Sequence, residues 1–165
     1  MKMVGRQREI ELLEKLYNSQ KAEFVCVYGR RRVGKTFLIN EVFQNRLTFK
    51  FTALSSSGIE VGAVRQLERF VVVLESYGQE SGRNPKDWFE AFDQLKVYLR
   101  RKEGRKVVFI DELPWLDYPR SQFLSAFENF WNAWGSAQSD LMLIVCGSST
   151  SWIVNKLLGN RGGLH

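Results

Sequence analysis

The chain has 165 residues, of which 44% are hydrophobic and 13% aromatic, so it is long and apolar enough to form one domain with its own core. It contains no apolar run of about 18 residues and no apolar stretch near its start, which argues against a membrane span and a secretory signal, and we expect a cytoplasmic protein. The net charge of +6 permits a nucleic-acid partner, whereas two cysteines in apolar segments favour buried, reduced thiols, and a single histidine at the last position argues against a zinc site.

The first predicted elements are a helix, a strand and a second helix. Apolar side chains recur at helical spacing within residues 9–18, which predicts an amphipathic helix. The apolar run 23–28 predicts a strand, and helical spacing returns after residue 36 and continues to about residue 45. A segment rich in glycine and arginine connects this strand to the second helix.

That connecting segment, residues 29–36, reads Gly-Arg-Arg-Arg-Val-Gly-Lys-Thr and fully matches the phosphate-binding P-loop pattern. Because a strand precedes it and a helix follows, its backbone N–H groups would point at phosphate oxygens with the positive end of the helix behind them. Lys35 would reach the β- and γ-phosphates, and the Thr36 hydroxyl would hold Mg²⁺. The alternative is a glycine-rich turn with a surface lysine. The nucleotide-binding residues predicted here are Gly29, Arg30, Arg31, Arg32, Val33, Gly34, Lys35, Thr36 and Phe37.

The middle of the chain continues the alternation of strands and helices. We expect a strand at 47–53, helical structure over 61–74, a break at 81–85 and a strongly amphipathic helix at 86–101. The basic run 100–106 follows. It is either a solvated helix end, which the helix macrodipole favours, or a surface that contacts DNA.

A second motif follows the basic run. Residues 107–110 are all apolar, which predicts a strand buried on both faces, and the strand ends in Asp111 and Glu112. This is the Walker B pattern. Ligands of an open α/β sheet bind at the carboxyl ends of its strands, so these carboxylates would lie beside the P-loop. Asp111 would hold Mg²⁺ and Glu112 would polarise the attacking water, whereas the alternative is an ordinary acidic turn.

The last predicted elements complete the pattern. A loop at 113–119 leads to an aromatic-rich helix at 121–134, a strand at 141–146, the turn 147–149 and a short helix at 151–158. Strands that alternate with helices predict a parallel sheet in a layered α/β sandwich. The aromatic stripes of the helices are most simply core, and a functional aromatic platform is the alternative.

With these motifs in place, the chain resembles the AAA-type ATPases. More narrowly, it resembles the archaeal-type ATPase family of bacteria and archaea, which is related to the STAND and origin-recognition ATPases. The resemblance spans nearly the whole chain, and its narrowest signals are Asp-Glu-Leu-Pro-Trp (111–115) and Cys-Gly-Ser-Ser (146–149). The other matching segments are 4–10, 28–36, 130–135 and 160–165.

The resemblance implies roles for single residues. The matches are Val4, Gly5 and Arg6 in the box near the adenine, Lys35 and Thr36 in Walker A, and Asp111 and Glu112 in Walker B. Ser148 matches sensor 1, whose polar side chain contacts the γ-phosphate or the attacking water. Ser149 is the second choice for that role, and an ordinary turn serine is the alternative to both.

The resemblance also implies an architecture, a three-layer P-loop NTPase sandwich with five parallel strands in the order 5-1-4-3-2. Four of those strands are predicted here, so we expect residues 1–165 to be the N-terminal part of an AAA-type core without the fifth strand and the lid. The strand at 23–28 would then be an unpaired edge, which favours self-association. The arginine finger and sensor 2 would be absent unless Arg161 replaces them, and turnover would then be slow.

Together, motifs and resemblance predict an Mg²⁺-dependent ATPase that acts as a conformational switch. The predicted catalytic residues are Lys35, Glu112 and Ser148, and the predicted metal ligands are Thr36 and Asp111. The alternatives are a nucleic-acid-associated ATPase, with DNA bound by the basic surface or a missing C-terminal domain, a small-molecule P-loop kinase, and a non-hydrolysing ATP-binding interaction module.

Overall fold

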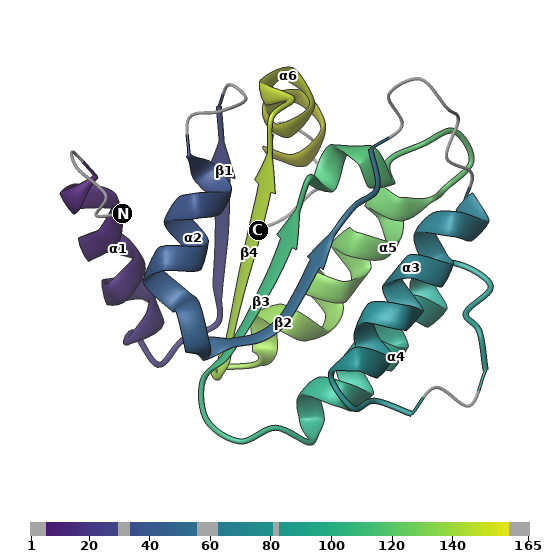
Figure 1. Cartoon of the computed structure of the whole chain (residues 1–165), viewed down its shortest axis with the longest axis horizontal. Helices are drawn as coiled ribbons and strands as arrows, with labels where there is room; N and C mark the ends of the chain where they lie inside the picture. The colour runs from purple at the N-terminus through teal and green to yellow at the C-terminus, as the bar shows by residue number, and fades with distance from the viewer. Residues whose placement is uncertain (1–5, 30–33, 56–62, 81–82, 159–165) are drawn as a thin grey trace.

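A sheet of parallel strands lies at the centre of the molecule (Figure 1). The computed structural model describes residues 6–29, 34–55, 63–80 and 83–158. Its strands are β1 (Glu23–Tyr28), β2 (Leu47–Thr52), β3 (Lys106–Asp111) and β4 (Leu141–Gly147). They lie in the order β1-β4-β3-β2, which is the order that the resemblance predicts for the first four strands.

Helices cover both faces of the sheet and make the predicted three layers. They are α1 (Gln7–Tyr17), α2 (Lys35–Phe43), α3 (Ala63–Ser76), α4 (Trp88–Arg100), α5 (Phe123–Asn129) and α6 (Thr150–Trp152). Figure 1 shows α1 and α2 on one side of the sheet and α3, α4 and α5 on the other. None of the helices in the described part of the chain has both the length and the apolar character that crossing a membrane needs.

The alternation of side chains along β3 and β4 builds two separate cores. Phe109 and Ile144 face α1 and α2, whereas Val108 and Leu143 face the other three helices. All seven residues of β4 are buried. Full burial of an aliphatic side chain contributes about 1.5–3 kcal/mol, so the central strands hold the layers together. This is why both strands read as continuous apolar runs in the sequence.

β1 differs from the central strands because it lies at the edge of the sheet. It pairs with β4 and, among the described residues, with no other strand. Its residues are consequently only half-buried, apart from the exposed Tyr28. The predicted edge position is confirmed. The prediction that both cysteines are buried holds for Cys146 but not for Cys26, which is half-buried because it lies on this edge strand; both are free thiols.

The aromatic stripes of the helices form the larger core, as the simpler interpretation predicts. Phe92 of α4 stacks on Phe130 with ring centroids 4.9 Å apart. Trp88 meets Phe123 edge-on at 5.3 Å and Phe70 of α3 at 5.6 Å. All five side chains are buried, so they stabilise the fold and do not form a binding platform.

Two helices start later than the sequence pattern predicts. The helix predicted from residue 86 starts at Trp88, because the Asp87 carboxylate accepts a hydrogen bond of 2.9 Å from the Glu90 N–H and so caps it. The helix predicted from residue 121 starts at Phe123, because Gln122 has a left-handed backbone with φ 53°. That helix is α-helical to Asn129 and then widens into a π-helix at Phe130–Trp134.

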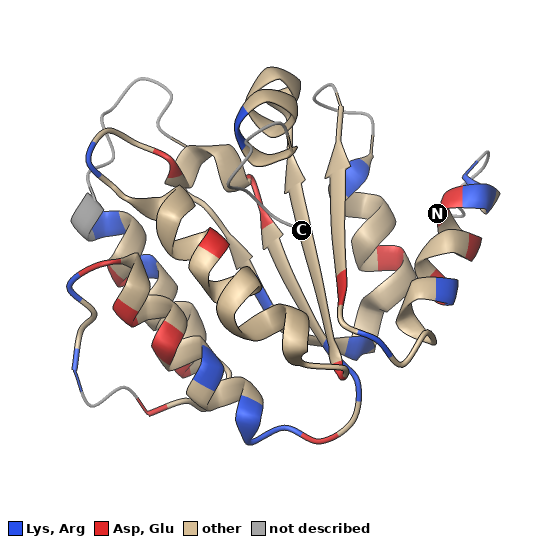
Figure 2. Ribbon diagram, turned by 180° about the vertical axis from the view of Figure 1, so that it is seen from behind, with Lys and Arg blue, Asp and Glu red and all other residues tan. Residues whose placement is uncertain are grey.

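The basic run 100–106 lies at the end of the sheet where the strands begin, and part of it serves the fold (Figure 2). Arg105 donates hydrogen bonds to the carbonyls of Lys21 at 2.6 Å, Ser139 at 2.8 Å and Leu16 at 2.9 Å. Lys106 pairs with Asp140 at 2.7 Å. Neither interpretation of this run anticipates that Arg105 ties three chain segments together.

Candidate functional site

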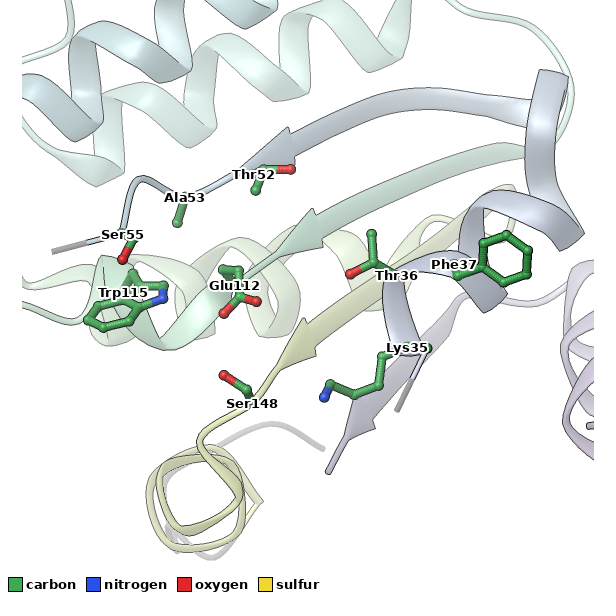
Figure 3. Close-up of a pocket in the computed structure, with 10 residues that line it drawn as sticks. Lys35, Thr36, Phe37, Thr52, Ala53, Ser55, Glu112, Trp115 and Ser148 are labelled. Atoms are coloured by element: carbon green, nitrogen blue, oxygen red, sulfur yellow. The ribbon is translucent and has the colours of Figure 1, made fainter. Parts of the chain in front are cut away.

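An open cavity of about 530 Å³ lies at the carboxyl ends of β2, β3 and β4 (Figure 3). Its walls come from the start of α2, from the end of β2, and from residues that follow β2, β3 and β4. The lining residues are Gly34, Lys35, Thr36, Phe37, Thr52, Ala53, Ser55, Glu112, Trp115 and Ser148. The parallel sheet thus brings together segments that are far apart in the sequence, at the edge where α/β sheets bind ligands.

The described ends of the P-loop have the backbone that the pattern requires. Gly34, which precedes α2, has φ 82°, a conformation that residues with a side chain rarely adopt. The Lys35 side chain is 8% exposed, and its ammonium donates a hydrogen bond of 2.9 Å to the Gly29 carbonyl. Lys35 is therefore held at the mouth of the loop. The predicted ligands Arg30, Arg31, Arg32 and Val33 lie outside the described residues.

The two predicted metal ligands touch each other. The Thr36 hydroxyl donates a hydrogen bond of 2.7 Å to Asp111 Oδ2. The other carboxylate oxygen, Oδ1, accepts one of 2.9 Å from the Glu112 N–H, and Asp111 is 5% exposed. A fixed carboxylate beside a hydroxyl is an oxygen-donor set that suits a hard cation such as Mg²⁺. In the described part of the chain, His, Cys, Asp and Glu form no group of three that could enclose a metal by themselves.

Glu112 has a strained backbone. Its φ of 56° and ψ of 40° place it in the left-handed region, which costs a residue with a side chain about 1–2 kcal/mol. It follows the end of β3 and precedes a 3₁₀ helix, Leu113–Leu116, within the segment predicted as a loop. In Figure 3 its carboxylate lies between Ser148 and Trp115 and faces the cavity. Strain of this kind persists where the surrounding structure holds a functional side chain in place.

Ser148 lies opposite the P-loop. It follows β4 directly and lines the cavity, and Figure 3 shows its hydroxyl turned toward Glu112, with the Lys35 ammonium across the opening. Ser149, the second choice, lies behind it and lines a neighbouring hollow. The geometry therefore favours Ser148 for the sensor position. Phe37 borders the cavity, but its ring points away from the other labelled side chains (Figure 3).

A second hollow of about 480 Å³ opens on the other side of Lys35, between α1, β1 and α2. Arg6 and Tyr28 line it together with apolar side chains of α1 and α2. Arg6 also approaches the loop, because a Cβ built on Gly34 would lie 4.0 Å from its guanidinium. The other two residues of the predicted adenine box, Val4 and Gly5, lie outside the described residues.

Cys26 lines this second hollow, but it does not supply a reactive group there. Burial raises the pKa of the Cys26 thiol to about 12, and burial likewise raises the pKa of Cys146, with a smaller contribution from the nearby Asp111 carboxylate. Because the thiolate is the nucleophilic form, both side chains are unreactive near neutral pH. The hollow is thus suited to binding and not to covalent chemistry.

Sequence reasoning missed the wall formed by Thr52, Ala53, Ser55 and Trp115. Thr52 is the last residue of β2, and Ala53 and Ser55 follow it, so the rule that ligands bind at carboxyl ends of strands could have found all three. Buried Gln66 of α3 holds this wall, since it accepts from the Leu54 N–H at 3.0 Å and donates to the Leu54 carbonyl at 2.9 Å. Trp115 falls within the segment 111–115 that carries the resemblance, but it was given no role there, because its place in the cavity depends on the 3₁₀ helix after β3.

The fold is shared with solved P-loop ATPase structures. The chain is similar to a Walker-type ATPase of Pyrococcus abyssi, with a TM-score of 0.64 and 19% identity over 98% of this chain and 50% of that one. It is also similar to Cdc6p of Pyrobaculum aerophilum, with a TM-score of 0.61 and 17% identity over 94% and 42%. The Drosophila ORC, solved bound to DNA, gives a TM-score of 0.56 and 19% identity over 94% and 41%.

Two curated proteins of Methanocaldococcus jannaschii are similar in sequence. An uncharacterized protein is 28% identical over 165 residues, which is 98% of this chain and 33% of that protein. An uncharacterized ATP-binding protein is 49% identical over 43 residues, which is 26% of this chain and 73% of that protein. The chain thus spans about a third of the length of the relative that it matches from end to end.

The family comparison covers almost every residue. Residues 3–164 match the family of ATPase domains found predominantly in Archaea. The four-stranded parallel sheet in the order β1-β4-β3-β2 and the P-loop at its edge agree with that match. The chain therefore belongs to this archaeal family of P-loop ATPase domains.

Proposed function

We propose that this domain binds Mg·ATP at the P-loop and hydrolyses it, and that the loss of the γ-phosphate switches its conformation. The observation that carries the proposal is the 2.7 Å hydrogen bond between Thr36 and Asp111, which joins the two motifs. Family membership supports ATP as the nucleotide. Thr36 and Asp111 would hold Mg²⁺, which when bound neutralises phosphate charge.

Each nearby residue then has a defined task. Lys35 binds the β- and γ-phosphates from the loop side. Glu112 accepts a proton from the water that attacks the γ-phosphate, and Ser148 orients that water or the phosphate from the opposite wall. The hollow beside Arg6 receives the base, because most of its lining residues are apolar and it opens next to Lys35.

The test compares phosphate release from Mg·ATP by the parent chain and by Glu112→Gln. We expect the parent to release phosphate and the variant to lose about 10²–10⁴-fold in rate. Both should bind a fluorescent ADP analogue equally. Glu103→Gln is the matched control, because Glu103 is exposed in the loop at the opposite end of the sheet. Equal rates in parent and Glu112→Gln would remove Glu112 from the mechanism, and ATP binding without release would favour the non-hydrolysing module.

DNA is the second candidate partner. The observation that favours it is the run Arg100, Arg101 and Lys102, which is exposed and lies before β3, at the end of the sheet where the strands begin. We propose that DNA, if bound, contacts this run through its phosphates. Retention of the protein on duplex DNA should then weaken steeply as the salt concentration rises, and it should fall when all three residues are replaced by alanine. No retention at low salt would exclude the described surface as a DNA site.

A further inference from the structure

The segments that carry Glu112 and Ser148 are joined directly, behind the cavity. Gly147 packs its backbone against the Pro114 ring, because a Cβ built on Gly147 would lie 2.7 Å from Pro114 Cδ and 2.9 Å from Cγ. Contacts this short leave no room for any side chain at residue 147. The end of β4 and the turn after β3 are therefore in van der Waals contact one residue before Ser148 and two residues after Glu112.

A second connection lies farther along the same two segments. Asp117 Oδ2 accepts a hydrogen bond of 2.7 Å from the Trp152 indole N–H and pairs with the Lys156 ammonium at 3.2 Å. The Asp117 side chain is 19% exposed and the Lys156 side chain 59% exposed. The hydrogen bond to Trp152 is thus the sheltered part of the connection, and the ion pair is the solvated part, which contributes little.

An open hollow of about 380 Å³ is lined by residues of both segments. Its walls are Glu112, Pro114, Trp115, Ser148, Ser149 and Trp152. The helical segment that carries Trp152, residues 150–158, is short and buries Ile153 and Leu157. Ile153 and Leu157 anchor this segment in the core, and the bond between Asp117 and Trp152 ties it to the turn after β3.

We propose that Asp117 is a positioning residue that, through Trp152, holds the segment 150–158 and with it Ser148 in register with Glu112. This rests on the proposed function, in which Ser148 and Glu112 face the γ-phosphate. The connection has no contact with the P-loop in the described structure, so it acts on the recognition of ATP and leaves the binding of ADP unchanged. Asp117 thereby helps the domain to distinguish ATP from ADP.

Four substitutions separate the parts of the connection. Asp117→Ala removes both bonds, and Trp152→Phe removes the indole donor while it keeps an aromatic ring. Asp117→Asn keeps an oxygen acceptor for Trp152, and Lys156→Met removes only the ion pair. Asp140→Ala is the matched control, because Asp140 forms an ion pair of the same kind at 2.7 Å with Lys106 at the other end of the sheet.

The readouts are the affinities for Mg·ADP and for a non-hydrolysable ATP analogue, together with kcat and KM for ATP. We expect Asp117→Ala and Trp152→Phe to lose about 2- to 12-fold in the preference for the ATP analogue, the equivalent of one hydrogen bond, at unchanged ADP affinity. The value of kcat should fall by more than KM changes. A variant that combines Asp117→Ala with Trp152→Phe should lose no more of this preference than either single variant. Asp117→Asn, Lys156→Met and Asp140→Ala should resemble the parent.

Unchanged ADP affinity also shows that each variant is folded. An equal loss for ADP and for the ATP analogue, or additive losses in the double variant, would overturn the positioning role. If the parent prefers the ATP analogue and Asp117→Ala keeps that preference, the positioning role alone fails. If the parent releases no phosphate from Mg·ATP, the proposed function fails and the role of Asp117 fails with it, whereas a parent that releases phosphate without preferring the ATP analogue overturns the role of Asp117 alone.

Discussion

The two ends of the sheet both carry basic side chains, but they use them differently. At the end where the strands finish, Lys35 and Thr36 line an open cavity with Glu112 and Ser148. At the end where the strands begin, Arg105 is bound to three backbone carbonyls and Lys106 to Asp140. Positive charge alone therefore does not identify a binding site, because a cation that the fold itself satisfies stabilises the protein.

The comparison is tested most sharply by replacing Lys35 and Arg105 in turn, because we expect the two substitutions to have opposite effects on nucleotide binding and stability. Lys35→Ala should weaken nucleotide binding by about 10- to 150-fold, which is the 1.5–3 kcal/mol that a hydrogen bond to a charged group contributes. The midpoint of thermal unfolding without nucleotide should change little. Calorimetric titration with Mg·ATP and thermal unfolding measure both quantities. A variant that binds ATP normally would contradict the P-loop assignment.

Arg105→Ala should show the reverse pattern. We expect a loss of about 1.5–3 kcal/mol in the free energy of unfolding, because charge-assisted hydrogen bonds to three carbonyls disappear together. Nucleotide affinity should remain that of the parent. Arg101→Ala is the control, since its exposed side chain makes one hydrogen bond of 3.3 Å to Gln79 and should matter little. Urea unfolding with a nucleotide titration checks both, and weakened binding in Arg105→Ala would show that the two ends are coupled.

Gly34→Ala tests whether the site end carries backbone strain of its own. Among the described residues, the added methyl would approach only the Arg6 guanidinium, at 4.0 Å, so the expected penalty comes from the φ of 82°. We expect a loss of about 1–2 kcal/mol in the free energy of unfolding without nucleotide. Ala substitution at Gly104, another open position with φ 76° at the opposite end, is the comparison. If Gly34→Ala leaves the free energy of unfolding unchanged while Gly104→Ala lowers it, the P-loop relaxes to accommodate the added side chain.

The smallest expected effect concerns Glu14 and Arg46, which form two hydrogen bonds of 3.0 and 2.6 Å between α1 and the segment after α2. The hydrogen bonds from Arg46 lower the pKa of Glu14, so this carboxylate contributes stability above its unfolded-state pKa and loses it as pH falls through the lowered value. Glu14→Gln should cost less than about 1 kcal/mol at pH 7, because the pair is partly exposed. The free energies of unfolding of the parent and Glu14→Gln should converge as the pH falls into the acid range. A difference that stays constant with pH would show that the Glu14 charge does not cause it.

The sequence predicted the sheet and most of the described residues that line the cavity, because both depend on local patterns. The continuous apolar runs at β3 and β4 exist because helices cover both faces, and the P-loop pattern exists because one turn must wrap a phosphate. Family resemblance then predicted the strand order, which periodicity cannot supply.

What the sequence did not predict depends on contacts between distant segments. The left-handed backbone of Glu112, the role of Arg105 as a tie between three segments, and the bond from Asp117 to Trp152 all have no local signature. Gln122 is a similar case, since its left-handed backbone delays α5 by two residues although the sequence there reads as helix. Such features become visible only when the packing of the whole chain is known.

The strand order also has a consequence for how the chain is made. β1, which leads into the P-loop, pairs with β4, the last strand of the described structure, and not with either strand that follows it. During synthesis β1 therefore has no sheet partner until β4 has left the ribosome, and its pairing depends on contacts of large sequence separation, which form slowly. Until then the apolar side chains of β1 have no sheet to pack in, and exposed apolar surface of this kind makes a nascent chain prone to aggregate.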